Sequence, residues 1–154
     1  GINMIAEHYN IPVIYSTHPR SMKKIEERNF KFNPLVKNLK PFGFFEYNKL
    51  QKNAYAVISY SWTLSEESSM LNFPRILIRT STERPEALDK ACFILAGIDE
   101  KSLLQAVDVA VEMNGNSDIG IPVPDYIEEN VSTKVVKLIQ SYTGVVNKTV
   151  WRKY

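Results

Sequence analysis

Residues 56–86 read AVISYSWTLSEESSMLNFPRILIRTSTERPE, a strand, a helix, a second strand and a polar turn in succession. The apolar runs at 56–59 and 75–79 are short and β-rich, which is typical of strands covered on both faces. Between them, Thr63 precedes Glu66 by three residues, a spacing that predicts a capping box at the start of a helix over 64–71. The stretch therefore predicts a strand–helix–strand unit of a parallel sheet.

The same alternation continues on both sides of this unit. Further strands are predicted at 12–16, 36–40 and 92–96, and further helices at 19–28, 45–53, 83–90 and 100–112. We therefore expect residues 1–125 to form an α/β domain, Rossmann-like and three-layered, with a parallel sheet of at least five strands. Residues 126–154 are expected to form a helical tail, with a helix over 131–151 that is interrupted near Gly144. Because this helix is rich in apolar residues, we expect it to pack on this domain or to cross onto another domain.

Composition favours a soluble globular protein. Of the 154 residues, 44% are hydrophobic and 23% charged, which argues against disorder, and the net charge of +2 is too dispersed for a nucleic-acid binder. A single cysteine, Cys92, and the absence of a run long enough to cross a membrane favour the cytoplasm. Because the chain opens on Gly1 without a signal segment, we expect it to come from a longer polypeptide.

Ligands of open α/β sheets bind beyond the carboxyl ends of the strands, so the residues that follow each predicted strand are candidates. After the first strand, Thr17, His18 and Arg20 bring a hydroxyl, an imidazole and a guanidinium together, which suits an anion or a nucleotide. The alternative is an ordinary helix start, in which Thr17 caps the helix and both His18 and Arg20 are solvated.

The ends of the strands at 56–59 and 75–79 carry two more polar clusters. Ser61, Thr63 and the first N–H groups of the following helix suit phosphate, and Glu66 or Glu67 suits sugar hydroxyls. An acidic first turn that complements the helix dipole explains the two glutamates equally. The third cluster, 80–86, adds hydroxyls, carboxylates and Arg84, and by itself reads as a capped short helix. No metal-ligand spacing occurs, and we interpret Cys92 as a buried strand residue.

The second and third clusters together carry a family resemblance. Residues 59–67, SYSWTLSEE, and 82–86, TERPE, resemble the second domain of the UDP-N-acetylglucosamine 2-epimerase family, whose pattern is (S/T)-D-S-G-(G/T)-(I/L)-x-E-E, a strand and (T/H)-E-R-P-E. The stretches 15–21, 40–43 and 130–151 look most like the branch that acts on UDP-2-acetamido-2,6-dideoxy-talose, or on fucosamine precursors of surface polysaccharides.

This resemblance implies a two-domain fold like that of the B-type glycosyltransferases, with a UDP-sugar in the cleft between two Rossmann-like halves. The chain resembles the second half, so the first domain and the first strand of the second are missing. The implied reaction inverts C2 of a UDP-2-acetamido sugar by eliminating UDP and adding it back, without metal or redox cofactor. The missing domain and a second copy of the chain are the implied protein partners. Alone, the chain is expected to be inactive.

The resemblance also assigns site residues. Ser61, Trp62 and Thr63 stand where the family holds the diphosphate, and Glu67 stands where a carboxylate takes the ribose hydroxyls, with Glu66 beside it. The remaining positions line the cleft near the sugar, the phosphates or the uracil: His18, Arg20, Arg84 and either Tyr47 or Phe44. Of the catalytic groups only His18 is a candidate in this chain, since the others are implied upstream of Gly1.

Two residues depart from the pattern: Tyr60 replaces the family aspartate and Trp62 replaces the first glycine. An indole at 62 predicts weaker diphosphate binding, because glycine lets the backbone approach phosphate. The departures leave two rival interpretations open, the UDP-binding half of a B-type glycosyltransferase and a nucleotide-sugar-binding domain without catalysis.

Overall fold

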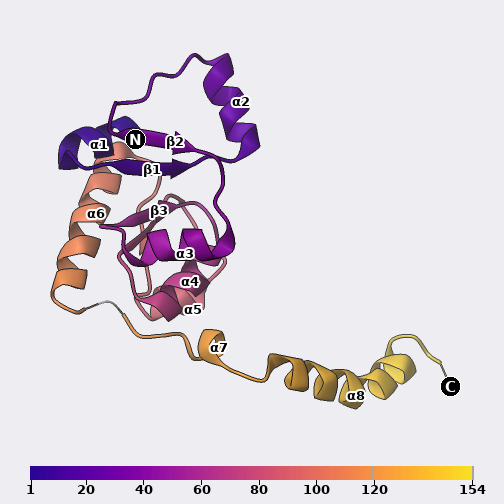
Figure 1. The fold of residues 1–154 in the computed structure, drawn as a ribbon. Coiled ribbons are helices and arrows are strands. Elements are labelled where there is room, and N and C mark those ends of the chain that lie inside the picture. Colours follow the sequence, from indigo (N-terminus) through magenta and orange to yellow (C-terminus); the bar gives the residue numbers. More distant parts are fainter. Residues whose placement is uncertain (119, 154) are drawn as a thin grey trace. The chain divides into compact units, whose positions relative to one another are not determined.

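The computed structural model describes residues 1–118 and 120–153 and contains two compact units, Gly1–Val123 and Pro124–Tyr154. The predicted domains, 1–125 and 126–154, include Ile119 and Tyr154, which lie outside the described residues. Strands and helices alternate through the first unit (Figure 1). The elements are α1 (Ile2–Tyr9), β1 (Val13–Ser16), α2 (Pro19–Glu27), β2 (Val36–Leu39), α3 (Phe44–Lys52), β3 (Val57–Ser59), α4 (Thr63–Leu71), β4 (Arg75–Leu77), α5 (Pro85–Asp89), β5 (Ile94–Leu95), α6 (Glu100–Gly115), α7 (Pro124–Ile127) and α8 (Val131–Thr149).

All strand pairs are parallel, which confirms the predicted α/β class. β1 pairs with β2, and β3, β4 and β5 pair in that order, with Ile76 opposite Ile58 on one side and Ile94 on the other. The prediction of one sheet with at least five strands is wrong in detail, because in the described residues no pairing joins β1 to β3. The five strands of the described residues, each two to four residues long, are instead divided between a pair and a group of three.

One layer of the core lies between the strands and the helices α1 and α6. Ile76 of β4 is completely buried and packs in a cluster with Leu103 and Val107 of α6. Helix α1 was not predicted from the sequence, yet its Ile5 joins the same cluster. The hydroxyl of Tyr9, at the end of α1, donates a hydrogen bond of 2.6 Å to the carboxylate of Asp108 on α6. This bond joins α1 to α6.

A second group of buried residues belongs to α4, α5 and the segments beside them. Leu64, Leu77 and Val123 are almost completely buried, and the hydroxyl of Ser69 accepts a hydrogen bond of 2.8 Å from the backbone N–H of Val123. Arg75 is 3% exposed and its guanidinium donates to the backbone oxygen of Ser68 in the last turns of α4. Burial lowers the pKa of Arg75 to about 10. The arginine therefore closes the carboxyl end of α4.

The second unit consists of α7 and α8. The predicted break near Gly144 is wrong, because α8 runs without interruption from Val131 to Thr149. Glycine costs only about 1 kcal/mol inside a helix, which the apolar and straight-chain neighbours tolerate. No helix in the part of the chain that the structure describes is long and apolar enough to cross a membrane.

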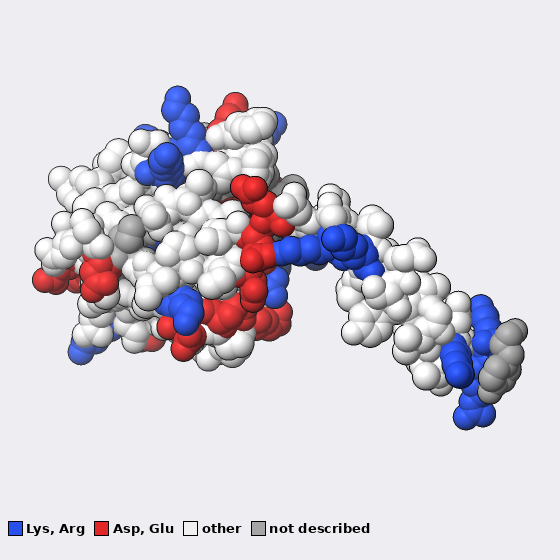
Figure 2. All heavy atoms as spheres, turned by 90° about the horizontal axis from the view of Figure 1, so that it is seen from below, with Lys and Arg blue, Asp and Glu red and all other residues white. Residues whose placement is uncertain are grey.

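Apolar side chains recur along α8 every three or four residues, and none of its residues is buried. They therefore share one face of the helix: Val135, Leu138, Ile139, Tyr142, Val145 and Val146. Between residues 130 and 153 the charged side chains are Lys134, Lys137, Lys148, Arg152 and Lys153. Figure 2 shows Lys and Arg along this segment, whereas the larger unit displays both signs of charge.

Candidate functional site

The candidate site is built at the carboxyl ends of β3 and β4. These two strands are parallel and in register, with Ser59 opposite Leu77, so the segments that follow them leave the same edge of the sheet. The first segment leads through Ser61 into α4, and the second leads through Thr82 into α5. Two of the three predicted clusters therefore start from neighbouring positions.

The start of α4 differs from the prediction. The N-cap residue is Trp62 rather than Thr63, and within the described residues no side chain caps this end of the helix, so the predicted capping box of Thr63 and Glu66 is wrong. The hydroxyl of Thr63 lies 2.8 Å from that of Ser61 instead. The first N–H groups of α4 and two hydroxyls thus lie together at a helix end that favours negative charge.

Trp62 and Arg79 pack against each other beside this helix end. The guanidinium carbon of Arg79 lies 3.8 Å from the centre of the Trp62 ring, and Arg79 Nε donates a 2.5 Å hydrogen bond to the backbone oxygen of Tyr60. Trp62 has a φ of −67°, which any residue adopts. Glycine at 62 is therefore not required by the backbone angle. Arg79 was not among the predicted site residues, since a cation–π pair between residues 17 positions apart leaves no local sequence pattern.

Glu66 and Arg84 connect the two strand ends directly. Arg84 Nη2 lies 2.8 Å from Glu66 Oε1, and both side chains are more than one third exposed. The hydroxyl of Thr82 accepts a 3.0 Å hydrogen bond from the backbone N–H of Arg84, which fixes the turn before α5. This ion pair explains why the capping box does not form: the carboxylate of Glu66 bonds to a guanidinium and not to the helix start.

Glu67 is held by the neighbouring helix α3. Gln51 Nε2 donates a 2.8 Å hydrogen bond to Glu67 Oε2, and Gln51 is only 3% exposed. Burial raises the pKa of Tyr47, and the nearby Glu67 carboxylate raises it further. The structure therefore brings Tyr47 close to Glu67, two residues that the family resemblance assigns to the nucleotide. Gln51 was missed, because nothing in its local sequence indicates a contact with α4.

The first predicted cluster is present but separate from this network. His18 is the N-cap residue of α2, and its Nδ1 accepts a 3.2 Å hydrogen bond from the backbone N–H of Arg20. The alternative in which Thr17 caps this helix is wrong, because Thr17 is 1% exposed and its hydroxyl bonds to Asn38. In the described chain, the hydrogen bonds of His18 and Arg20 do not reach the α4 network. Phe44, the first residue of α3, is 71% exposed and stacks edge-on against Phe45.

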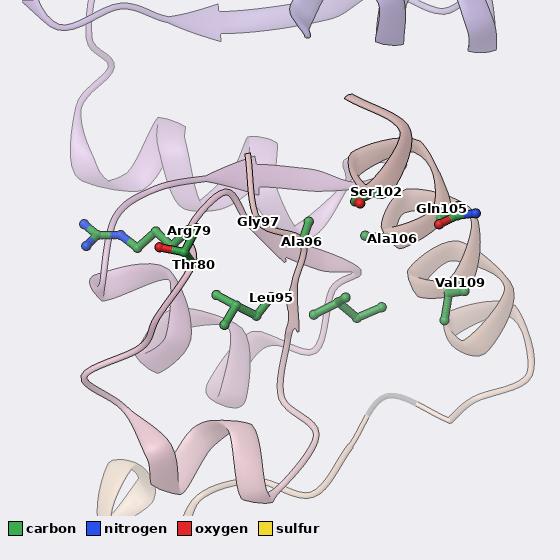
Figure 3. A pocket seen from close by; sticks show the side chains of 10 residues that line it. Arg79, Thr80, Leu95, Ala96, Gly97, Ser102, Gln105, Ala106 and Val109 are labelled. Atoms are coloured by element: carbon green, nitrogen blue, oxygen red, sulfur yellow. The ribbon is translucent and has the colours of Figure 1, made fainter. Parts of the chain in front are cut away.

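A shallow cavity of about 530 Å³ lies next to the network, at the ends of β4 and β5. Figure 3 shows Arg79 and Thr80 on one side of β5 and Ser102, Gln105 and Val109 on the other. Its lining also includes the apolar residues Ile94, Leu95 and Ala96. Of its lining residues only Arg79 also contacts Trp62, so this cavity adjoins the α4 site without including it.

Metal binding finds no support in the described ranges 1–118 and 120–153, where no three His, Cys, Asp or Glu side chains gather as ligands. Cys92 is 2% exposed, and its thiol donates a 3.2 Å hydrogen bond to the backbone oxygen of Ile121. Burial of Cys92 is confirmed, but its predicted place in a strand is wrong, because β5 begins at Ile94.

Known proteins resemble both the sequence and the fold. A UDP-N-acetylglucosamine 2-epimerase of Methanococcus maripaludis is 38% identical over 118 residues, which are 74% of this chain and 32% of the relative. A UDP-N-acetylglucosamine 2-epimerase structure from Rickettsia bellii superposes with a TM-score of 0.85 at 37% identity, covering 99% of this chain and 42% of that one. The chain thus spans about a third of the length of the curated relatives it matches.

A second solved structure was determined with ligands. The Methanocaldococcus jannaschii UDP-GlcNAc 2-epimerase in complex with UDP-GlcNAc and UDP has a TM-score of 0.76 at 29% identity, over 89% of this chain and 38% of that one. The family model described as UDP-N-acetylglucosamine 2-epimerase matches residues 1–140. The chain therefore belongs to the UDP-N-acetylglucosamine 2-epimerase family.

Proposed function

We propose that this chain is the UDP-binding part of an epimerase that inverts C2 of a UDP-2-acetamido sugar for surface polysaccharide synthesis. The branch proposed is the one acting on UDP-2-acetamido-2,6-dideoxy-talose or fucosamine precursors. The observation that carries the proposal is the uncapped start of α4, where the Ser61 and Thr63 hydroxyls lie 2.8 Å apart at the ends of paired parallel strands. The protein acts in the cytoplasm, a compartment that its single buried cysteine suits.

In the proposed complex, the diphosphate lies against the N–H groups of Trp62 and Thr63. The Ser61 and Thr63 hydroxyls donate to phosphate oxygens, and the positive end of the α4 dipole stabilises their charge. Glu67 accepts hydrogen bonds from the ribose hydroxyls, and the uracil lies near Tyr47, with Phe44 at the outer end of α3. The diphosphate, the ribose and the uracil thus follow one another from the ends of β3 and β4 toward α3.

The sugar lies on the side of Arg84, whose guanidinium is held by Glu66. Departure of UDP develops negative charge on the diphosphate, and a fixed cation beside it lowers the barrier. The hydrogen bond that His18 Nδ1 accepts leaves Nε2 as the N–H donor of the ring, so in the proposed complex His18 donates a hydrogen bond toward the ligand, with Arg20 beside it. The acid or base at C2 belongs to the domain that this chain does not contain.

Calorimetric titration of UDP into the purified chain tests the proposal. We expect binding that weakens about tenfold in Glu67→Ala, since a charge-assisted hydrogen bond contributes about 1.5–3 kcal/mol. The matched control is Glu112→Ala, which removes an exposed carboxylate from α6 and is expected to leave the affinity unchanged. Equal weakening in both variants, or no binding by the unaltered chain, would contradict the proposal.

Self-association is a second expectation, because a helix face with six large apolar side chains is stable in water only when it is covered. We expect sedimentation velocity to show species larger than the 17.7 kDa monomer. The double variant Leu138→Ser and Val145→Ser should shift the chain to monomer. Gln140→Ser with Asn147→Ser, which has the same spacing, should not. A strictly monomeric unaltered chain would refute this expectation.

A further inference from the structure

The hydrogen bond between Gln51 and Glu67 joins two helices at the edge of the proposed nucleotide site. Gln51 belongs to α3 and Glu67 to α4, and Nε2 of Gln51 lies 2.8 Å from Oε2 of Glu67. An ionised carboxylate only accepts hydrogen bonds, so the NH₂ group of the amide must face it. The contact therefore fixes both the orientation of the Gln51 amide and the position of one Glu67 oxygen.

Gln51 has an energetic cost at this position. The residue is 3% exposed, and within the described residues its Oε1 finds no hydrogen-bond partner. A buried polar atom without a partner destabilises a fold, whereas an apolar side chain of similar size would pack without that penalty. Stability of α3 therefore does not account for glutamine at position 51. The hydrogen bond to Glu67 is a contact that an apolar residue would lose.

The same helix face also carries Tyr47. Tyr47 precedes Gln51 by four residues on α3, so the two side chains lie on one face. The pKa of Tyr47 is raised by burial first and by Glu67 second, and hydrogen bonding from Gln51 opposes the rise. Gln51 thus lies between the residue proposed to face the uracil and the one proposed to bind the ribose.

We propose that Gln51 is a positioning residue, which holds the Glu67 carboxylate toward the ribose and so makes the site prefer ribonucleotides over 2′-deoxyribonucleotides. The inference rests on the proposed function. With Oε2 bonded to Gln51, the carboxylate has a fixed plane and its free lone pairs keep one direction. Without that bond the half-exposed carboxylate rotates into solvent and must be reordered when the nucleotide binds.

The test compares dissociation constants for UDP and 2′-deoxy-UDP, measured by calorimetry. The unaltered chain should prefer UDP by about tenfold, which is the effect of one hydrogen bond to a charged group. In Gln51→Met we expect the two nucleotides to bind about equally, with 2′-deoxy-UDP unaffected. Gln105→Met, an exposed glutamine on α6, is the matched control and should keep the preference.

A melting curve of each variant shows whether it folds. Gln51→Glu provides a second variant, of the same size, whose carboxylate repels Glu67. This variant should also lose the preference for UDP over 2′-deoxy-UDP. The inference is overturned if either folded variant keeps the preference, or if both nucleotides weaken equally, as a merely structural role predicts. Failure of the proposed function looks different: the unaltered chain then binds neither nucleotide, and the inference falls with it.

Discussion

Replacing Ile76 with alanine is expected to lower the free energy of unfolding by about 3 kcal/mol, because large-to-small changes in a core cost about 2–5 kcal/mol. Ile76 is completely buried in β4, between β3 and β5, and packs against α6. Urea denaturation followed by circular dichroism measures the change as a lower midpoint. The matched control is Ile98→Ala, since Ile98 is 77% exposed and its loss should cost less than about 0.5 kcal/mol. Equal midpoints for the two variants would contradict the burial of Ile76 described for β4.

Replacing Trp62 with glycine is expected to strengthen UDP binding about ten- to a hundred-fold, and Tyr60→Asp should strengthen it less. Phosphate oxygens must come within about 3 Å of the N–H groups at the start of α4, and a Cβ atom with an indole hinders that approach. Glycine also releases Arg79, which the indole now holds at 3.8 Å. One added charge-assisted hydrogen bond of about 1.5–3 kcal/mol gives a change of this size.

Tyr60 acts less directly, because its side chain is 64% exposed and only its backbone oxygen bonds to Arg79. An aspartate there would orient N–H groups of the loop, and phosphate would repel its charge. Calorimetric titration of UDP into the unaltered chain and the two single variants measures both effects. Equal affinities for all three proteins would mean that the loop tolerates the indole.

Local sequence patterns predicted most of the elements that build the fold. The short apolar runs identified β3 and β4, and the apolar spacing of 100–112 identified α6, because both patterns can be recognised in neighbouring residues. β4 is buried throughout, and Val57 is the buried residue of β3. α1 was missed. It begins at the second residue and has no side-chain cap in the described chain, so none of the usual start signals precedes it.

The contacts of the candidate site were harder to predict, since they join residues that are distant in sequence. The spacing of Thr63 and Glu66 favoured a capping box, but Arg84, 18 residues further on, competes successfully for the Glu66 carboxylate. Gln51 and Glu67 are 16 residues apart and lie on different helices. Family motifs therefore located the candidate residues, while the partners that orient them required the folded chain.

UDP is proposed to bind at the carboxyl ends of β3 and β4, against the start of α4. Amide chemical shifts of the ¹⁵N-labelled chain, followed while UDP is added, test it most directly. We expect the largest shifts on residues 61–67 and on Tyr47 and Arg84, and a shift of the side-chain amide of Gln51 as well. Saturable shifts confined to the cavity beside β5, around Ser102 and Gln105, or no shifts at millimolar UDP, would contradict it.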